Sequence, residues 1–60
     1  MFTYRFENIE INETFVLVED LDRHNGAQVW RKTNEDEGRA TEHGQGRSFR
    51  RGQNVLKVRV

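Results

Sequence analysis

The stretch Ala27–Thr33 (AQVWRKT) contains the only tryptophan of the chain, Trp30, among polar and cationic residues. The most apolar run of the sequence, Phe15–Val18 (FVLV), precedes it, and the pair Asn25-Gly26 lies between the two. An Asn-Gly pair supplies the positive φ angles that tight reversals need, and apolar runs on both sides of it are typical of a β-hairpin. We therefore predict a long hairpin over Thr14–Thr33, with Trp30 as its largest hydrophobic anchor.

The strands of this hairpin are expected at Thr14–Glu19 and Ala27–Thr33. In the second strand Trp30 and Val29 lie on opposite faces, because side chains alternate along a strand. One face of a small sheet is buried, so part of Trp30 or of Val29 is expected to stay exposed.

The segment Phe2–Phe6 alternates aromatic and polar residues, which predicts a strand with one buried face. The buried residues would be Phe2, Tyr4 and Phe6. The alternative is an exposed aromatic platform on which nucleic-acid bases stack. After this strand we expect Ile9 and Ile11 to pack under the sheet and Asn12-Glu13 to form a turn.

Three glycine-containing segments are predicted as turns: Asn34–Gly38, Gly44–Gly46 and Arg50–Asn54. In the first, Gly38 is suited to a positive φ angle. Between the turns, the polar segment Arg39–His43 has Ala40 as its single apolar residue, and we predict that it forms the edge of the sheet.

Both ends of the sequence are strand-like, and pairing them would join two apolar stripes and remove two sheet edges. In the last segment, Val55–Val60, the alternation predicts an inward and an outward face. The inward residues are Leu56, Val58 and Val60, and the outward residues are Lys57 and Arg59. Short strands separated by regularly spaced glycine turns indicate a small sandwich or barrel. We predict an all-β fold for residues 1–60, a single small antiparallel barrel of five to six strands and of SH3-like size.

A loose group of small phage and prophage proteins has a similar pattern, to which this sequence shows a resemblance along most of its length. The pattern begins Phe-x-x-Leu/Ile-x-x-Gly/Asn-Glu-x-Phe and continues with an aromatic-x-Lys motif, a glycine, a late phenylalanine and a valine-rich end. The matching residues are Phe6, Ile9, Asn12, Glu13, Phe15, Trp30, Lys32, Ala40, Gly44, Phe49 and Val55. The resemblance implies a β-rich fold and a phage or mobile-element origin, and it implies no catalytic residue.

The sequence offers little for catalysis or for metal binding. Ser48 is the only serine, and there is no cysteine. His24 and His43 are 19 residues apart, and neither has a nearby histidine or cysteine that would complete a zinc site. We therefore expect no enzymatic activity, no metal and no cofactor. Met1–Phe6 does not lead into the apolar region of an export signal, and no run is long enough to cross a membrane, so we expect a cytoplasmic protein.

The net charge is zero, but the charges are unevenly distributed. Met1–Trp30 has two basic and six acidic residues, and Arg31–Val60 has eight basic and four acidic ones. This distribution predicts a basic binding face, pairing of the two halves across strands, or a homodimer in which unlike halves meet.

Arginine suits bidentate contacts to carboxylate or phosphate, and the cationic residues are therefore the candidate binding site. They are Arg47, Arg50, Arg51, Lys57 and Arg59, with Arg31 and Arg39 near them, and Trp30 and Tyr4 are the candidate aromatic contacts. Two functions follow. The first is a module that binds a protein partner through an edge strand and the arginine-rich face, and in a phage setting it would inhibit a host protein by occlusion. The second is a barrel that binds nucleic-acid phosphates through Arg47–Arg59, against which the zero net charge argues.

Overall fold

The computed structural model describes residues 3–21 and 27–58. Several predictions concern residues outside these ranges: those for Phe2, His24, Asn25-Gly26, Arg59 and Val60. The described elements are six strands and two short 3-10 helices. In chain order they are β1 (Tyr4–Arg5), η1 (Phe6–Asn8), β2 (Thr14–Leu17), η2 (Val18–Asp20), β3 (Val29–Lys32), β4 (Glu37–Ala40), β5 (Gly46–Ser48) and β6 (Asn54–Lys57).

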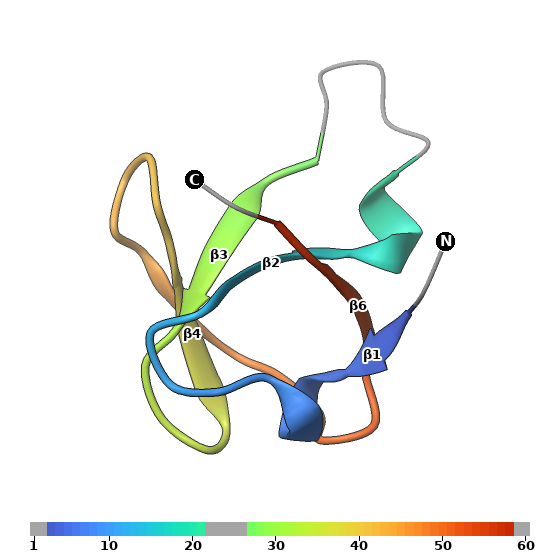
Figure 1. Ribbon diagram of the computed structural model, residues 1–60. Helices are drawn as coiled ribbons and strands as arrows, with labels where there is room; N and C mark the ends of the chain where they lie inside the picture. The colour runs from blue at the N-terminus through green and yellow to red at the C-terminus, as the bar shows by residue number, and fades with distance from the viewer. Residues whose placement is uncertain (1–2, 22–26, 59–60) are drawn as a thin grey trace.

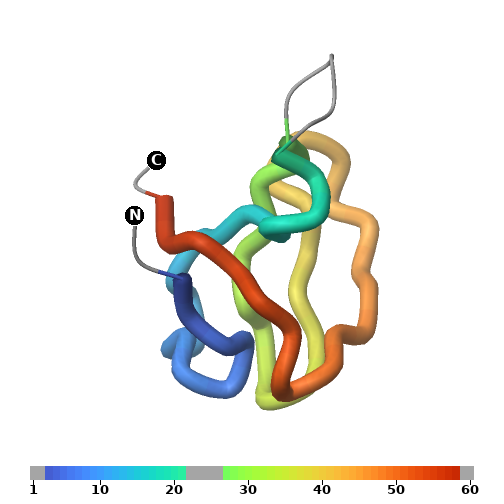
Figure 2. The backbone as a smooth tube through the Cα atoms, turned by 90° about the vertical axis from the view of Figure 1, so that its right-hand side faces the viewer, coloured from blue at the N-terminus to red at the C-terminus, as the bar shows by residue number. Residues whose placement is uncertain are grey.

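The strands form one antiparallel sheet in the order β1-β6-β2-β3-β4-β5, which confirms the all-β class (Figure 1). β2 and β3 pair as the predicted hairpin, with Phe15 opposite Trp30. The first and last strands also pair as predicted, with Tyr4 opposite Val55. β1 and β5 are the two ends of this order, so the described strand pairs make an open sheet, and Figure 1 and Figure 2 show that this sheet is strongly curved. Closure of the sheet into a barrel stays a prediction.

Aromatic rings form the centre of the core on the concave side of the sheet. Phe6, Phe15 and Phe49 are mutual neighbours, with ring centroids 5.1 to 5.4 Å apart, and Trp30 meets Phe49 edge to face at 5.2 Å. Such offset and edge-to-face contacts stabilise beyond the area they bury. Trp30 is only 8% exposed, which confirms it as a buried anchor of the hairpin.

The N-terminal strand is shorter than predicted, and Tyr4 is 38% exposed rather than buried. The alternation stops because Phe6 begins η1, where its main-chain oxygen accepts a hydrogen bond from the Ile9 amide. Phe6 and Ile9 are buried by this turn, whereas Ile11 is 54% exposed, so the prediction for Ile11 was wrong. The turn that follows contains Asn12 at a φ of 79°, a left-handed conformation that asparagine tolerates better than most residues.

β4 is not the edge that the sequence predicted. It lies between β3 and β5, and the outer strand is β5, which the sequence placed partly in a turn. Gly38 lies inside β4 and not at a positive φ angle. A Cβ atom there would lie 3.1 Å from the main-chain oxygen of Arg31 and 3.1 Å from the Phe49 ring, so the glycine allows close packing. The next turn does contain a positive φ, of 71° at Gly44.

The strands of the hairpin and of the C-terminus also differ from their predicted limits. β2 ends at Leu17, and η2 begins where the strand was expected to continue. In β6 Val55 is fully buried, Leu56 is half-buried, and Lys57 is exposed as predicted; Val58, directly after the strand, is half-buried. The predicted inward face was wrong because Val55 lies opposite Leu17 of β2, which is also fully buried, so the side chain of Val55 is on the core side of the sheet. Within the described ranges, no helix has the length and apolar character needed to span a lipid bilayer.

Candidate functional site

The outer edge of β5 presents main-chain hydrogen-bonding groups that β4 does not use. β5 is antiparallel to β4, with Arg47 opposite Gly38. The Gln45 oxygen accepts from the Ala40 amide at 3.0 Å, and the Phe49 amide donates to the Asp36 oxygen at 2.8 Å. In an antiparallel ladder the paired residues alternate, so Gly46 and Ser48 direct their amide and carbonyl groups away from β4. All three residues of β5 are exposed.

A groove of about 600 Å³ lies beside this edge, on the side of the sheet to which Arg47 points. Its described lining residues are Glu19, Asp20, Gln28, Trp30, His43, Gln45, Gly46 and Arg47. The guanidinium of Arg47 lies 5.1 Å from the centroid of the Phe49 ring and 5.9 Å from that of Trp30. Arg47 thus covers the aromatic core at the β5 edge, and the structure brings together two residues predicted to bind, Arg47 and Trp30.

The convex face of the same strands carries a row of side chains that runs across the sheet. Arg31 of β3 is directly opposite Arg39 of β4, and Arg39 is directly opposite Gly46 of β5. Both arginines are exposed. Among the described residues, no carboxylate lies within ion-pair distance of either guanidinium; Arg31 donates instead to the main-chain oxygen of Asn12 at 3.3 Å. The row ends at Gly46 on the outer edge of β5, where the absence of a side chain leaves the surface open.

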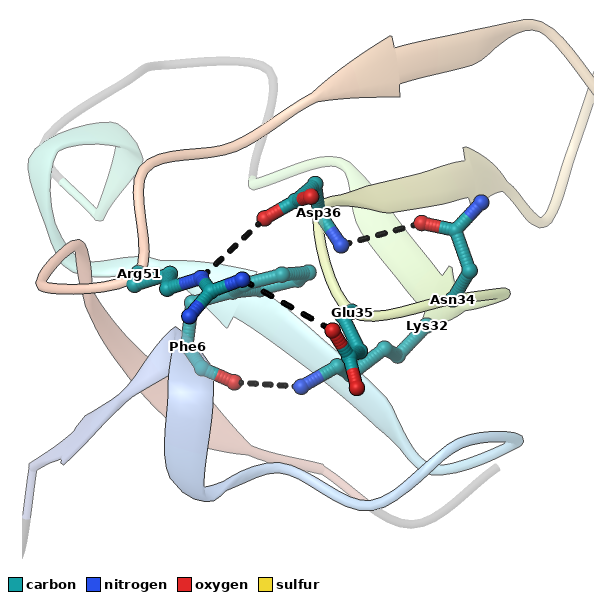
Figure 3. Close-up of polar contacts among 6 residues, drawn as sticks. All are labelled: Phe6, Lys32, Asn34, Glu35, Asp36 and Arg51. Atoms are coloured by element: carbon teal, nitrogen blue, oxygen red, sulfur yellow. Dashed lines mark hydrogen bonds and ion pairs between the residues drawn. The ribbon is translucent and has the colours of Figure 1, made fainter.

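Two of the predicted cations are held by carboxylates and lie on different parts of the molecule. Figure 3 shows Arg51 beside the turn between β3 and β4, with its Nε 3.3 Å from Asp36 and an Nη 3.6 Å from Glu35. Lys57 contacts Glu13 at 3.5 Å and lies 4.7 Å from the centroid of the Tyr4 ring. These ion pairs are exposed or half-buried and are therefore weak.

The residues of the predicted basic face thus lie at separate places on the molecule. Arg47 and Trp30 meet at the β5 edge, whereas Lys57 and Tyr4 meet at the β1 edge. Arg50 follows β5 in the chain and is exposed, without a described carboxylate in ion-pair distance. Arg59 lies outside the described residues.

A second groove, of about 420 Å³, is lined by Glu7, Asn8, Lys32, Glu35 and Arg51. Lys32 is 4% exposed; its Nζ donates to the main-chain oxygen of Phe6 at 2.9 Å and lies 4.4 Å from the centroid of the Phe6 ring (Figure 3). The described lining holds two carboxylates and two cations, so the charges of this groove balance within the protein. We interpret it as a structural link between η1 and β3.

The turn before β2 contains a carboxylate with a changed acidity. The Glu10 amide donates to Glu13 Oε1 at 2.8 Å, and this hydrogen bond is the main cause that lowers the pKa of Glu13 below its ordinary value of 4.5. The nearby Lys57 ammonium lowers the pKa further, against the opposing effect of burial. Within residues 3–21 and 27–58, no group of three histidine or carboxylate side chains is placed to hold a metal ion.

The sequence pointed only weakly to Arg31, Arg39 and Gly46. Alternation along β3 and β4 places each arginine on the solvent side, but it does not say that the two are opposite one another. That relationship depends on the pairing register, which joins residues from separate turns. Gly46 was interpreted as a turn residue because it follows Gly44 so closely.

No protein-family model, curated protein or solved structure matches this chain.

Proposed function

We propose that this chain is a small, non-catalytic binding module that takes up an extended segment of a protein partner as an additional strand beside β5. One observation carries the proposal: Gly46 and Ser48 direct their main-chain groups outward from a strand that has one described neighbour, β4. Strand addition of this kind obtains affinity from main-chain hydrogen bonds and specificity from alternate side chains.

The surroundings of β5 support binding at this place. The groove beside Arg47 and Trp30, which Glu19 and Asp20 also line, offers an aromatic ring and charged groups of both signs to side chains on one face of the added strand. The opposite face meets the row of Arg31 and Arg39. β5 is only three residues long, and short edge strands limit uncontrolled pairing while leaving a specific contact possible. We propose that the module is a partly open barrel: the sheet curves around the aromatic core, and the outer edge of β5 stays available for the added strand.

Nucleic-acid binding is the second candidate function, because the exposed guanidinium groups of Arg31 and Arg39 would suit phosphate. The protein partner is favoured for two reasons. The net charge is zero, and Arg51 and Lys57 are already paired with carboxylates. The resemblance to small phage proteins extends the proposal to a host protein that the chain would inhibit by occlusion.

The experiment tests the outward amide of Ser48. Peptides are selected against the purified protein from a displayed library of random sequences and then synthesised for titration. We expect bound peptides to shift the amide signals of Gly46 and Ser48 in NMR spectra. Ser48→Pro removes the outward N–H without removing a hydrogen bond to β4, and proline is tolerated at such edge positions. It should weaken peptide binding about tenfold or more, because one main-chain hydrogen bond is lost and the ring obstructs the edge.

Ser48→Ala is the matched control, since it changes the same side chain and keeps the amide. It should bind the peptides as the original protein does. Selected peptides that leave the Gly46 and Ser48 signals unmoved, or that bind Ser48→Pro at full strength, would refute strand addition at β5. Selection of no peptide at all would count against the proposal in the same way.

A further inference from the structure

Gly46 is a glycine that the fold itself does not require. A Cβ atom built there meets nothing within 4 Å, and its φ angle is not in the left-handed region. Glycine weakens a strand, because it has no side chain to pack and loses more backbone entropy on folding. A glycine in a strand often marks a bulge, a tight bend or a place where a ligand or another main chain approaches closely. At Gly46 another main chain would approach along the outer edge of β5, the side away from its one described neighbour, β4.

The row beside Gly46 contains two like charges in direct opposition. Arg31 and Arg39 are cross-strand neighbours, and like charges in that position are destabilising. No described carboxylate within ion-pair distance relieves the repulsion. An anion placed at this row would relieve it, and the open surface over Gly46 is the side from which a residue of an added strand can reach Arg39.

We propose that the partner segment carries an aspartate or glutamate at the position that pairs with Gly46, and that its carboxylate extends over the glycine to the guanidinium of Arg39, with Arg31 next in the row. This inference rests on the proposed strand addition. An added strand lies about 5 Å from β5 and therefore about 10 Å from β4, a distance that a glutamate and an arginine side chain cover together. Arginine and carboxylate also form bidentate hydrogen bonds.

A second copy of this chain does not supply such a residue. Its described sheet edges are β1 and β5, and the charged residues of these strands are Arg5 and Arg47. If β1 or β5 of a second copy paired with β5, it would bring another arginine near Arg31 and Arg39 or bring no acidic residue to them. Charge complementarity therefore favours a different protein with an acidic extended segment.

The experiment compares peptide selections against the original protein and against Arg39→Glu. For the original protein we expect one position of the enriched peptides to be held by Asp or Glu, and NMR contacts to place that position opposite Gly46. The affinity of such a peptide for Arg39→Glu should fall about tenfold, because an attractive contact becomes repulsive. Fresh selection against Arg39→Glu should no longer enrich an acid at that position.

Arg5→Glu is the matched control. It changes the net charge equally but lies on β1, at the other end of the strand order. Peptide affinity should change by about twofold or less, since the charge is distant and screened by salt. A second test leaves the protein unchanged: the acidic residue of the selected peptide is replaced by its amide. This peptide should bind the original protein about tenfold more weakly, because the charged contact with Arg39 is lost, and the comparison holds even if Arg39→Glu folds poorly.

Three results would overturn the inference. Peptides that bind along β5 without an acidic position, or equally well to Arg39→Glu, would leave strand addition standing and refute the acidic contact. Failure of all peptides to shift the Gly46 and Ser48 amides would refute both proposals. The third result is that no peptide binds, whereas single-stranded DNA or RNA binds in a salt-sensitive way and shifts the NMR signals of Arg31 and Arg39. It would show that the two arginines bind phosphate.

Discussion

Lys32, in the middle of the sheet, donates a hydrogen bond from its Nζ to the main-chain oxygen of Phe6, 26 positions earlier in the chain. The same oxygen accepts the Ile9 amide at 3.1 Å, so it closes η1 and receives a buried cation at once. The Phe6 ring lies beneath the ammonium group. This contact fastens the N-terminal segment to β3, a strand with which it makes no ladder (Figure 3).

Removing the charge of Lys32 should matter less than removing its side chain. Lys32→Met keeps an unbranched apolar stem, and the Phe6 oxygen keeps its bond from Ile9. The lost charged hydrogen bond is offset by the avoided cost of burying a charge, so stability should change by about 1 kcal/mol or less. Lys32→Ala also removes the buried stem and should cost about 2–3 kcal/mol. Urea denaturation of both variants measures the difference, and equal losses would contradict this account.

Substitutions of Trp30 should show how much a buried indole N–H without a hydrogen-bond partner lowers the stability of the fold. Its Nε1 is buried and has no hydrogen-bond partner among the described residues. Trp30→Ala should cost about 3–5 kcal/mol, most of the stability of so small a domain. Trp30→Phe keeps an aromatic ring against Phe49 and removes the unsatisfied donor, so we expect a clearly smaller loss. Thermal melting followed by circular dichroism compares them; an unchanged melting curve for Trp30→Ala would place the ring outside the core.

Two glycines of neighbouring strands should respond in opposite ways to alanine. At Gly38 the new methyl group would press against the Arg31 main chain and the Phe49 ring, and we expect a loss of about 1–3 kcal/mol. At Gly46 the methyl group has open space, and the reduced freedom of the unfolded chain should stabilise the fold by about 0.4–1 kcal/mol. Each variant is the other's control in the same denaturation series. Stabilisation by Gly38→Ala would show that the close packing is absent.

Glu13 should make stability depend on pH in the acid range. Its pKa is lowered in the fold, so its contribution is complete above the ordinary value of 4.5 and is lost as the pH falls through the folded value. Glu13→Gln cannot titrate and should remove this part of the acid sensitivity. Melting temperatures of both proteins, measured from neutral pH to below pH 4.5, test this. Parallel curves for Glu13→Gln and the original protein would contradict the prediction.

Arg50 and Arg51 are adjacent in sequence but should differ on reversal of charge. Arg51→Glu breaks exposed pairs with Glu35 and Asp36, which should cost about 1 kcal/mol or less in stability. Arg50→Glu breaks no described ion pair and should leave stability nearly unchanged. It should lower the affinity for an acidic partner segment that runs past Ser48. Denaturation and peptide titration together separate the two effects. A larger stability loss for Arg50→Glu than for Arg51→Glu would contradict the expectation that Arg51, and not Arg50, contributes to stability through ion pairs.

Local pattern was sufficient for the class of this fold and for two of its strand pairs. The alternation of apolar residues, the run Phe15–Val18 and the glycine turns indicated an antiparallel β protein, and the apolar hairpin strands and the two strand-like ends do pair. These features depend on the side-chain period and turn geometry of short segments, which a sequence displays directly.

The tertiary structure decided which strands lie at the edges of the sheet and which side chains are neighbours. The row of Arg31, Arg39 and Gly46, the burial of Lys32 and the exposure of Tyr4 all depend on which strands are neighbours and on their register. Pairing joins residues that are distant in the chain, and a shift of register by one residue turns every side chain to the other face. The sequence by itself therefore determined an all-β chain with an aromatic core, and only the paired sheet decided which strands lie at its two ends and that Arg31 and Arg39 lie opposite one another.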